Sequence, residues 1–180
     1  MASIVYDCYS VDASVMIALT EMGPHDIFEP AWDEISRLVS DNRWKIFETV
    51  ADELHDDELK NWLIFNDSAI VKFNEIINHY LTSLMAECQN NNMMLINPNN
   101  TRNIGDPFVV MLALYYEERD LNDLRVKTSG KRCCVLTNEL SREHKINIPY
   151  VCNYYDIPYM HLFDFMRHHQ WQISIDVQNP

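Results

Sequence analysis

The chain has 180 residues, of which 47% are hydrophobic and 23% are charged. This length fits one domain that buries roughly 70% of its unfolded surface, and the composition excludes disordered and fibrous proteins. The formal net charge of −13 argues against a simple nucleic-acid coat protein, because such proteins bind phosphates through clustered Lys and Arg.

The apolar stretches and the cysteines indicate the compartment. No apolar stretch approaches the roughly 20 residues that span a bilayer, and no basic segment precedes Ile4 and Val5. The five cysteines form an odd set without CxxC spacing, which is typical of reduced thiols rather than disulfides or a zinc site. We therefore expect a soluble, cytoplasmic protein that does not bind membranes.

The first third of the chain alternates between strand and helix patterns. The apolar run that ends at residues 9–12 predicts a strand, and helical spacing follows it. A helix is predicted for residues 28–40, with Pro30 in its first turn. Residues 44–47 predict a strand, which leads into a helix that Thr49 is expected to cap.

The same alternation continues to the C-terminal region. The expected elements are, in order, a long helix (69–88), an apolar helix (108–116) that Asp106 and Pro107 begin, a buried strand (133–137), a strand (158–162) and a final helix (163–169). Because strands alternate with helices, we predict an α/β fold with a central parallel sheet and right-handed crossovers, in a single domain over residues 1–180.

Four acidic residues lie where a site is expected to form. Asp12 ends the first strand and Glu139 follows the buried strand, so both are expected at the carboxyl edge of the sheet. Asp106 starts a helix, and Glu53 lies one turn into another. Converging carboxylates bind hard cations such as Mg²⁺ and Mn²⁺. Each acid taken alone also has a simpler interpretation, as a helix cap for Asp12 and Asp106 or as a solvated acid for Glu53 and Glu139.

A basic strip stands out from the acidic remainder of the chain. Residues 119–145 carry seven bases and four acids, whereas residues 1–60 carry fourteen acids and four bases. The strip is either a solvated charged loop or an edge that contacts phosphates. The residues expected to contact a nucleic-acid backbone are Arg125, Lys127, Lys131 and Arg132.

Four short blocks carry a resemblance to a known family. They are SVDASVMI (residues 10–17), VADEL (50–54), DPFVVMLA (106–113) and VLTNE (135–139). In order and approximate spacing they resemble the four acidic blocks of PIN domains. The tail, from IPYVC (148–152) through LFDFM (162–166) to Trp171, resembles a subgroup of VapC-like toxins of bacterial type II toxin-antitoxin systems. The resemblance extends over nearly the whole chain.

The resemblance implies a three-layer α/β/α sandwich that cuts RNA at phosphodiester bonds with Mg²⁺ or Mn²⁺. The catalytic and metal-binding roles fall by position on Asp12, Glu53, Asp106 and Glu139. Ser14, Thr137 and Asn138 would orient those carboxylates or a metal-bound water. Glu53 is preferred to Asp52 because adjacent residues on a helix diverge by roughly 100° and because Leu54 follows it as in the family.

The resemblance also implies partners. We expect an RNA substrate, a cognate protein antitoxin that covers the acidic crevice with an Arg or Lys, and a second copy of the chain in a homodimer. Residues 56–103 are expected to form a helical insertion beyond minimal PIN toxins.

A second function remains open at this stage. The chain could be a catalytically silent PIN-like binding or regulatory module, whose acids only hold a partner in place. A nucleotide-binding α/β protein is disfavoured, since no glycine-rich phosphate loop follows the first strand and the whole chain has three glycines.

Overall fold

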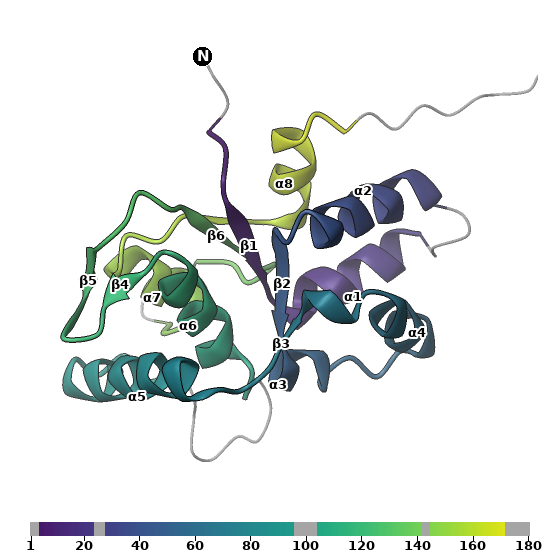
Figure 1. The fold of residues 1–180 in the computed structure, drawn as a ribbon. Coiled ribbons are helices and arrows are strands. Elements are labelled where there is room, and N and C mark those ends of the chain that lie inside the picture. The colour runs from purple at the N-terminus through teal and green to yellow at the C-terminus, as the bar shows by residue number, and fades with distance from the viewer. Residues whose placement is uncertain (1–3, 24–27, 96–103, 142–144, 172–180) are drawn as a thin grey trace, which may run out of the picture.

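The fold is built on a central parallel sheet (Figure 1). The computed structural model describes residues 4–23, 28–95, 104–141 and 145–171. The sheet has five strands in the order β3-β2-β1-β6-β7, and every neighbouring pair is parallel. Its strands are β1 (Cys8–Val11), β2 (Trp44–Phe47), β3 (Ile70–Val71), β6 (Cys133–Leu136) and β7 (Tyr159–Met160).

Helices cover both faces of this sheet (Figure 1). They are α1 (Ala13–Met22), α2 (Glu29–Ser40), α3 (Glu48–Ala51), α4 (Asp57–Phe65), α5 (Glu75–Asn90), α6 (Asp106–Tyr116), α7 (Ile148–Tyr154) and α8 (Leu162–His168). A 3-10 turn (Asp67–Ala69) precedes β3, and a hairpin of β4 (Arg119–Asp120) and β5 (Asp123–Lys127) follows α6. The predicted three-layer α/β/α fold is confirmed.

Helix α6 is the interior helix of one face. Eight of its 11 residues are buried, because it packs between the sheet and the helices α5 and α7. The hydroxyl of Ser10 on β1 donates a hydrogen bond to the backbone oxygen of Val109 on α6 (2.7 Å). This bond satisfies a polar side chain that is fully buried beneath the helix.

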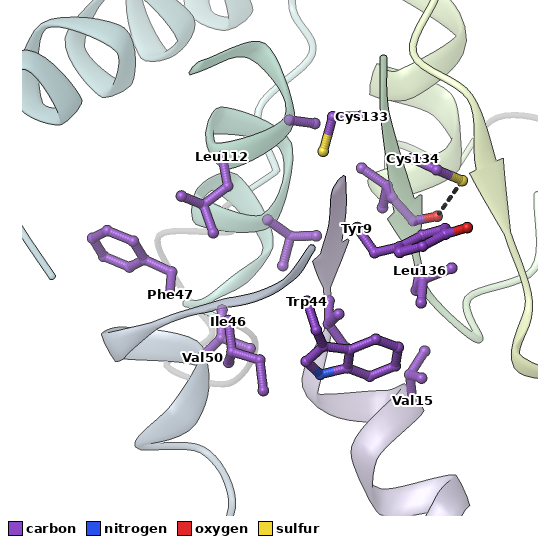
Figure 2. Close-up of a cluster of buried hydrophobic side chains, with 14 of the residues drawn as sticks. Tyr9, Val15, Trp44, Ile46, Phe47, Val50, Leu112, Cys133, Cys134 and Leu136 are labelled. Carbon is purple, nitrogen blue, oxygen red and sulfur yellow. Dashed lines mark hydrogen bonds between the residues drawn. The ribbon is translucent and has the colours of Figure 1, made fainter. Parts of the chain in front are cut away.

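The other face carries α1, α2 and α8. Tyr9 and Trp44 are register partners on β1 and β2, so their side chains share this face. The ring of Phe165 on α8 meets both of them edge-on, with centroids 5.1 and 5.5 Å away. Figure 2 shows Tyr9 and Trp44 on one side of β1, with Leu112 and Phe47 on the other. Strands β1, β2 and β6 are therefore buried on both faces, as expected of strands between helical layers.

Two helix predictions were wrong in their extent. The helix predicted for residues 69–88 begins only at Glu75, because Asn74 caps it by accepting a hydrogen bond from the Ile77 amide (2.9 Å). Residues 70–71 form the edge strand β3 instead, so the segment predicted as a helical insertion also extends the sheet. The helix after Thr49 lasts one turn and has no side-chain cap; Asp56 caps the separate helix α4.

The sequence patterns missed the β4–β5 hairpin and helix α7. The hairpin is rich in charge. Its first residue, Arg119, is buried, pairs with Glu117 (2.6 Å) and donates to the backbone oxygens of Leu124 and Arg125 on β5. Within the described ranges, none of the helices combines the length and the apolar character that crossing a bilayer requires.

The packing of helix α8 on the sheet should depend on the side chain of Phe165. We expect Phe165→Ala to lower the free energy of unfolding by about 3–5 kcal/mol, because it empties a fully buried ring site on the sheet. Urea denaturation measures the change. Phe163→Ala is the matched control, since Phe163 lies on the same helix with 58% of its surface exposed. Equal losses in the two variants would contradict the packing of α8 on the sheet.

Candidate active site

The four predicted acids lie around one cleft. Asp12 directly follows β1 and Glu139 follows β6, and these strands are neighbours with Val11 opposite Leu136. Glu53 comes after the short helix that follows β2, and Asp106 is the first residue of α6. The cleft has a volume of about 580 Å³ and is lined by Asp12, Ala13, Ser14, Ile17, Thr49, Asp52, Glu53, His55, Ile104, Asp106 and Glu139. It lies at the carboxyl edge of the sheet, the edge at which parallel sheets form their sites.

Asp12 is held by two hydroxyl groups. Its Oδ2 atom accepts hydrogen bonds from Ser14 Oγ and from Thr137 Oγ1, the latter at 2.9 Å. Asp12 occupies the N-cap position of helix α1, but its side chain makes no capping bond there and contacts Ser14 and Thr137 instead. Burial raises the pKa of Asp12, whereas the two hydroxyl groups lower it and the nearby charges of Glu139 and Glu53 raise it further.

Asp106 is a buried acid with other acids close to it. Its side chain is 8% exposed, and it makes no capping bond to α6, whose cap residue is Gly105. The helix-cap interpretation of Asp106 is therefore wrong. Burial is the main cause that raises the pKa of Asp106 to about 8, and the charges of Glu139, Asp12 and Glu53 add to it. A buried carboxyl group surrounded by other carboxyl groups binds a proton or a cation readily.

Glu53 and Glu139 are each anchored through one oxygen. The Gly105 amide donates to Glu53 Oε1 (2.9 Å), and the Ile148 amide at the start of α7 donates to Glu139 Oε2 (3.0 Å). A Cβ atom on Gly105 would lie 3.1 Å from Glu53 Oε1 and 3.0 Å from Val50, so a side chain here would have to displace these two residues by a few tenths of an ångström. Both glutamates belong to the site through backbone contacts that distant segments provide.

Asn138 joins three segments below the acids. Its amide nitrogens donate to Ser14, from the backbone N–H to Oγ (3.1 Å) and from Nδ2 to the backbone oxygen (3.2 Å). Its Oδ1 atom accepts a hydrogen bond from the Leu162 amide at the start of α8 (3.1 Å). Asn138 therefore contacts Ser14, which in turn contacts Asp12, and does not itself touch a carboxylate.

The cleft contains residues that the sequence patterns did not single out. Asp52 and Glu53 both line it, because α3 ends at Ala51 and both acids lie in the turn beyond. The expectation that helical geometry would turn one of them away was wrong. His55 also lines the cleft, and Lys145 lies at its rim with Nζ 3.7 Å from Glu139 Oε1. The adjacent acids of the VADEL block were the only sequence signal for this region.

The acids of the cleft are of the chemical type that hard divalent cations prefer, but they stand apart from one another. The predicted ligands are all carboxylates, which Mg²⁺ and Mn²⁺ prefer. Among the residues that the structure describes, no three His, Cys, Asp or Glu side chains converge closely enough to hold a metal ion. The acids thus surround the cleft without meeting at one point, an arrangement that lowers their mutual repulsion.

The predicted backbone-contact residues lie elsewhere. Arg125 and Lys127 are on β5, and Lys131 and Arg132 precede β6, at the amino edge of the sheet. None of the four lines the acidic cleft. The ion pairs they form are Arg125 with Asp123, Lys127 with Glu117, and Lys131 with Glu118.

One family model covers nearly the whole chain. It is described as "Domain of unknown function (DUF4411)" and matches residues 9–121 and 124–173. The chain belongs to the DUF4411 family. All four acids of the cleft lie within the matched segments. Comparisons with curated proteins and with solved structures found no match.

The acidic cleft should lower the stability of this DUF4411 chain in the absence of metal. The carboxyl group of Asp106 has a pKa of about 8 in the folded protein, against 3.8 ordinarily, so ionisation opposes folding as the pH rises between these values. We expect Asp106→Asn to raise the free energy of unfolding by about 1–2 kcal/mol at pH 8 in EDTA. The gain should disappear at pH 4, where the wild-type carboxyl group is also neutral.

Chemical denaturation at several pH values measures this effect. Asp33→Asn is the control, because Asp33 is an exposed residue on α2 outside the cleft. If Asp106→Asn stabilised the protein no more than Asp33→Asn at pH 8, the charge of Asp106 would not be the one that lowers the free energy of unfolding.

Proposed function

We propose that this chain is a metal-dependent RNA endonuclease, which hydrolyses phosphodiester bonds with Mg²⁺ or Mn²⁺ bound by Asp12, Glu53, Asp106 and Glu139. The observation that carries the proposal is the gathering of these four acids, from four separate segments, around one cleft at the carboxyl edge of the sheet. A cluster formed from such distant segments is difficult to explain by local helix capping or by solvated surface charge.

The electrostatics of the cleft supports the binding of a cation. The cleft holds the negative groups of five lining acids, and the nearest lysine contact is the long one from Lys145 to Glu139. Burial and mutual repulsion raise the pKa of both Asp12 and Asp106. A divalent cation would remove this repulsion, and its binding energy would compensate for the desolvation of the acids.

The chain fixes each of three carboxylates through one oxygen; the other oxygen of Glu139 has only the long ion pair with Lys145 (3.7 Å). Asp12 uses Oδ2 for its two hydroxyl donors, and Oδ1 has no hydrogen bond to a described residue. Glu53 uses Oε1 and Glu139 uses Oε2 for backbone amides. Ligands held in this way lose little rotational freedom on binding a metal, which is the role of outer-shell contacts.

The proposed chemistry needs no side-chain nucleophile. When bound, a divalent cation lowers the pKa of a water molecule and offsets the negative charge that develops on the phosphate. The carboxylates of the cleft would orient the attacking water, and the ammonium group of Lys145 at the rim would attract the substrate phosphate. Asn138 and Thr137 would keep the end of β6 in register with Asp12 during this process.

The biological setting is proposed from the resemblance to PIN domains. The resemblance suggests RNA as the substrate and the role of a toxin in a bacterial toxin-antitoxin pair. It also suggests a protein antitoxin and a second copy of the chain as partners, and the cytoplasm as the location. The acidic cleft is compatible with an antitoxin that inserts an Arg or Lys among the carboxylates. A catalytically silent binding module would use the same cleft without turnover, so activity has to decide between the two.

Cleavage of RNA should depend on the acids and on their hydroxyl partners. With Mn²⁺ and a mixed pool of tRNA and mRNA, we expect the wild-type protein to release discrete fragments, and Asp12→Asn or EDTA to abolish them. Thr137→Val should lower the rate by about 10–100-fold, because it removes one donor to Asp12 without changing the volume of the side chain. Gel electrophoresis of end-labelled RNA provides the measurement.

Asp33→Asn should cut at the wild-type rate, which controls for loss of surface charge. Activity that survives in Asp12→Asn would point to a contaminating nuclease. A folded wild-type protein that cuts no RNA with either metal would favour the silent binding module.

Metal binding should be visible without any substrate. At Mn²⁺ concentrations of about 100 times Kd, binding stabilises a protein by about 3 kcal/mol, which corresponds to about 5–10 °C in Tm for a chain of this size. We expect this rise for the wild-type protein and for Asp33→Asn, and at most a small rise for Asp12→Asn. Differential scanning fluorimetry with and without EDTA provides the test, and equal shifts in all three proteins would place the ion elsewhere.

A further inference from the structure

A second cleft opens at the opposite, amino edge of the sheet. Its volume is about 450 Å³, and it is lined by Ile4, Tyr6, Glu117, Lys127, Arg132, Asn153, Asp156, Ile157, Pro158 and Tyr159. It lies between the start of β6, the end of β5 and the loop from α7 to β7. We propose that this cleft, which we call the amino-edge cleft, binds one nucleotide of a single-stranded RNA.

The amino-edge cleft is lined by two cations, Lys127 and Arg132, although the chain is strongly acidic. Its buried acid, Glu117, is neutralised by Arg119, whose Nε and Nη2 atoms bond to Oε2 at 2.9 and 2.6 Å. Lys127 Nζ lies 3.4 Å from Oε1 of Glu117. Because Arg119 already neutralises Glu117, Lys127 adds a further positive charge. The four charged lining residues, Glu117, Lys127, Arg132 and Asp156, sum to zero, and Arg119 behind the lining neutralises Glu117. Lys127 and Arg132 thus face a single unneutralised lining acid, Asp156, and can bind a phosphodiester group, which carries one negative charge.

Arg132 is the cation best placed to bind a ligand. Its side chain is exposed, and its guanidinium group forms no hydrogen bond or ion pair with any residue that the structure describes. Arg132 and Tyr6 line the same cleft, and the charge of Arg132 lowers the pKa of the Tyr6 phenol, which burial raises. The planar donors of a free guanidinium group fit phosphate oxygens. With a tyrosine beside it, the group is suited to a phosphate that carries a base.

The remaining lining residues suit a nucleobase. The carboxylate of Asp156 and the side-chain amide of Asn153 line the amino-edge cleft, and neither bonds to another described side chain. Between them they offer acceptors and donors for the edge of a base. Tyr159, half-buried on the edge strand β7, offers a ring for stacking. Arg119 fixes the position of Asp156 by donating to its backbone oxygen (3.4 Å).

The position of the amino-edge cleft makes it a remote contact for the substrate. Thr137 lies five positions after Arg132 along β6, so the two ends of this strand are about 16 Å apart. An RNA strand that enters the acidic cleft would have to pass along the molecule to reach it. The choice of RNA as the ligand rests on the proposed function, and the contact would govern RNA affinity rather than the chemical step.

The test measures RNA binding in EDTA, where no metal-dependent cleavage occurs. Fluorescence anisotropy with a labelled single-stranded 12-mer should give Kd values that rise about tenfold or more for Arg132→Ala and for Lys127→Ala. Tyr159→Ala should weaken binding about fivefold or more, and Tyr159→Phe should retain wild-type affinity. The slope of log Kd against log salt should fall by about 0.7 for Arg132→Ala. Thermal unfolding checks that each variant is folded.

Arg125→Ala and Lys131→Ala are the matched controls. Both residues belong to the same basic strip and carry the same charge, but neither lines the amino-edge cleft. We expect changes below twofold, because Asp123 and Glu118 pair with these two cations, and the proposal therefore narrows the predicted backbone contacts to Lys127 and Arg132. Equal losses in all four variants would overturn the proposal in favour of diffuse attraction, and so would equal binding of a double-stranded RNA, whose bases cannot enter the cleft.

The two proposals can fail separately. A protein that binds RNA through Arg132 but cuts none would contradict the proposed endonuclease only. A protein that cuts RNA with the same KM in wild type and Arg132→Ala would overturn the amino-edge cleft only. Failure of the wild-type protein to bind the 12-mer at low salt would also overturn it.

Discussion

The parallel pairing of β1 with β6 is the constraint on which the candidate site depends. These strands are distant in sequence, yet their register places Val11 opposite Leu136, so Asp12 and Thr137 leave the sheet side by side. The bond from Thr137 to Asp12 closes this junction, and the amide of Asp12 donates to the backbone oxygen of Leu136 (2.9 Å). A slip of one residue in this register would turn Asp12 away from its partners.

The remainder of the fold supports a site that works against stability. Acids packed together below a protein surface cost free energy, and the raised pKa values of Asp12 and Asp106 are its sign. The compensation comes from a core that is buried on both faces of the sheet, with α6 on one side and the rings of Tyr9, Trp44 and Phe165 on the other. Functional sites commonly lower the stability of a protein, and favourable packing elsewhere in the fold offsets this loss.

Charge is divided between the two ends of the sheet. The carboxyl edge collects acids around a cleft, whereas the amino edge collects Lys127 and Arg132 around another. Neither arrangement follows from the net charge of −13, which conceals the separation. An ion that binds at one edge and a phosphate that binds at the other would experience local fields of opposite sign, and local fields decide binding at short range.

The sequence by itself determined the alternation of strands and helices, the parallel sheet, and the position of Asp12 and Glu139 just beyond two strands. These features follow from apolar periodicity and from the rule that parallel strands present their carboxyl ends together. The same reasoning gave the wrong start for α5, because Asn74 caps that helix and the residues before it pair with β2. Local propensity does not reveal an edge strand of two residues.

Only the tertiary structure decided which acids share the cleft and what holds them. Glu53 is fixed by the amide of Gly105, and Glu139 by the amide of Ile148. Asp52 joins the cleft because α3 ends at Ala51, and Lys127 and Arg132 of the strip line the cleft at the other edge. Such contacts join residues far apart in the chain, so no local pattern encodes them. The sequence specified which groups were available, and packing of the sheet against α6 and α7 decided where they meet.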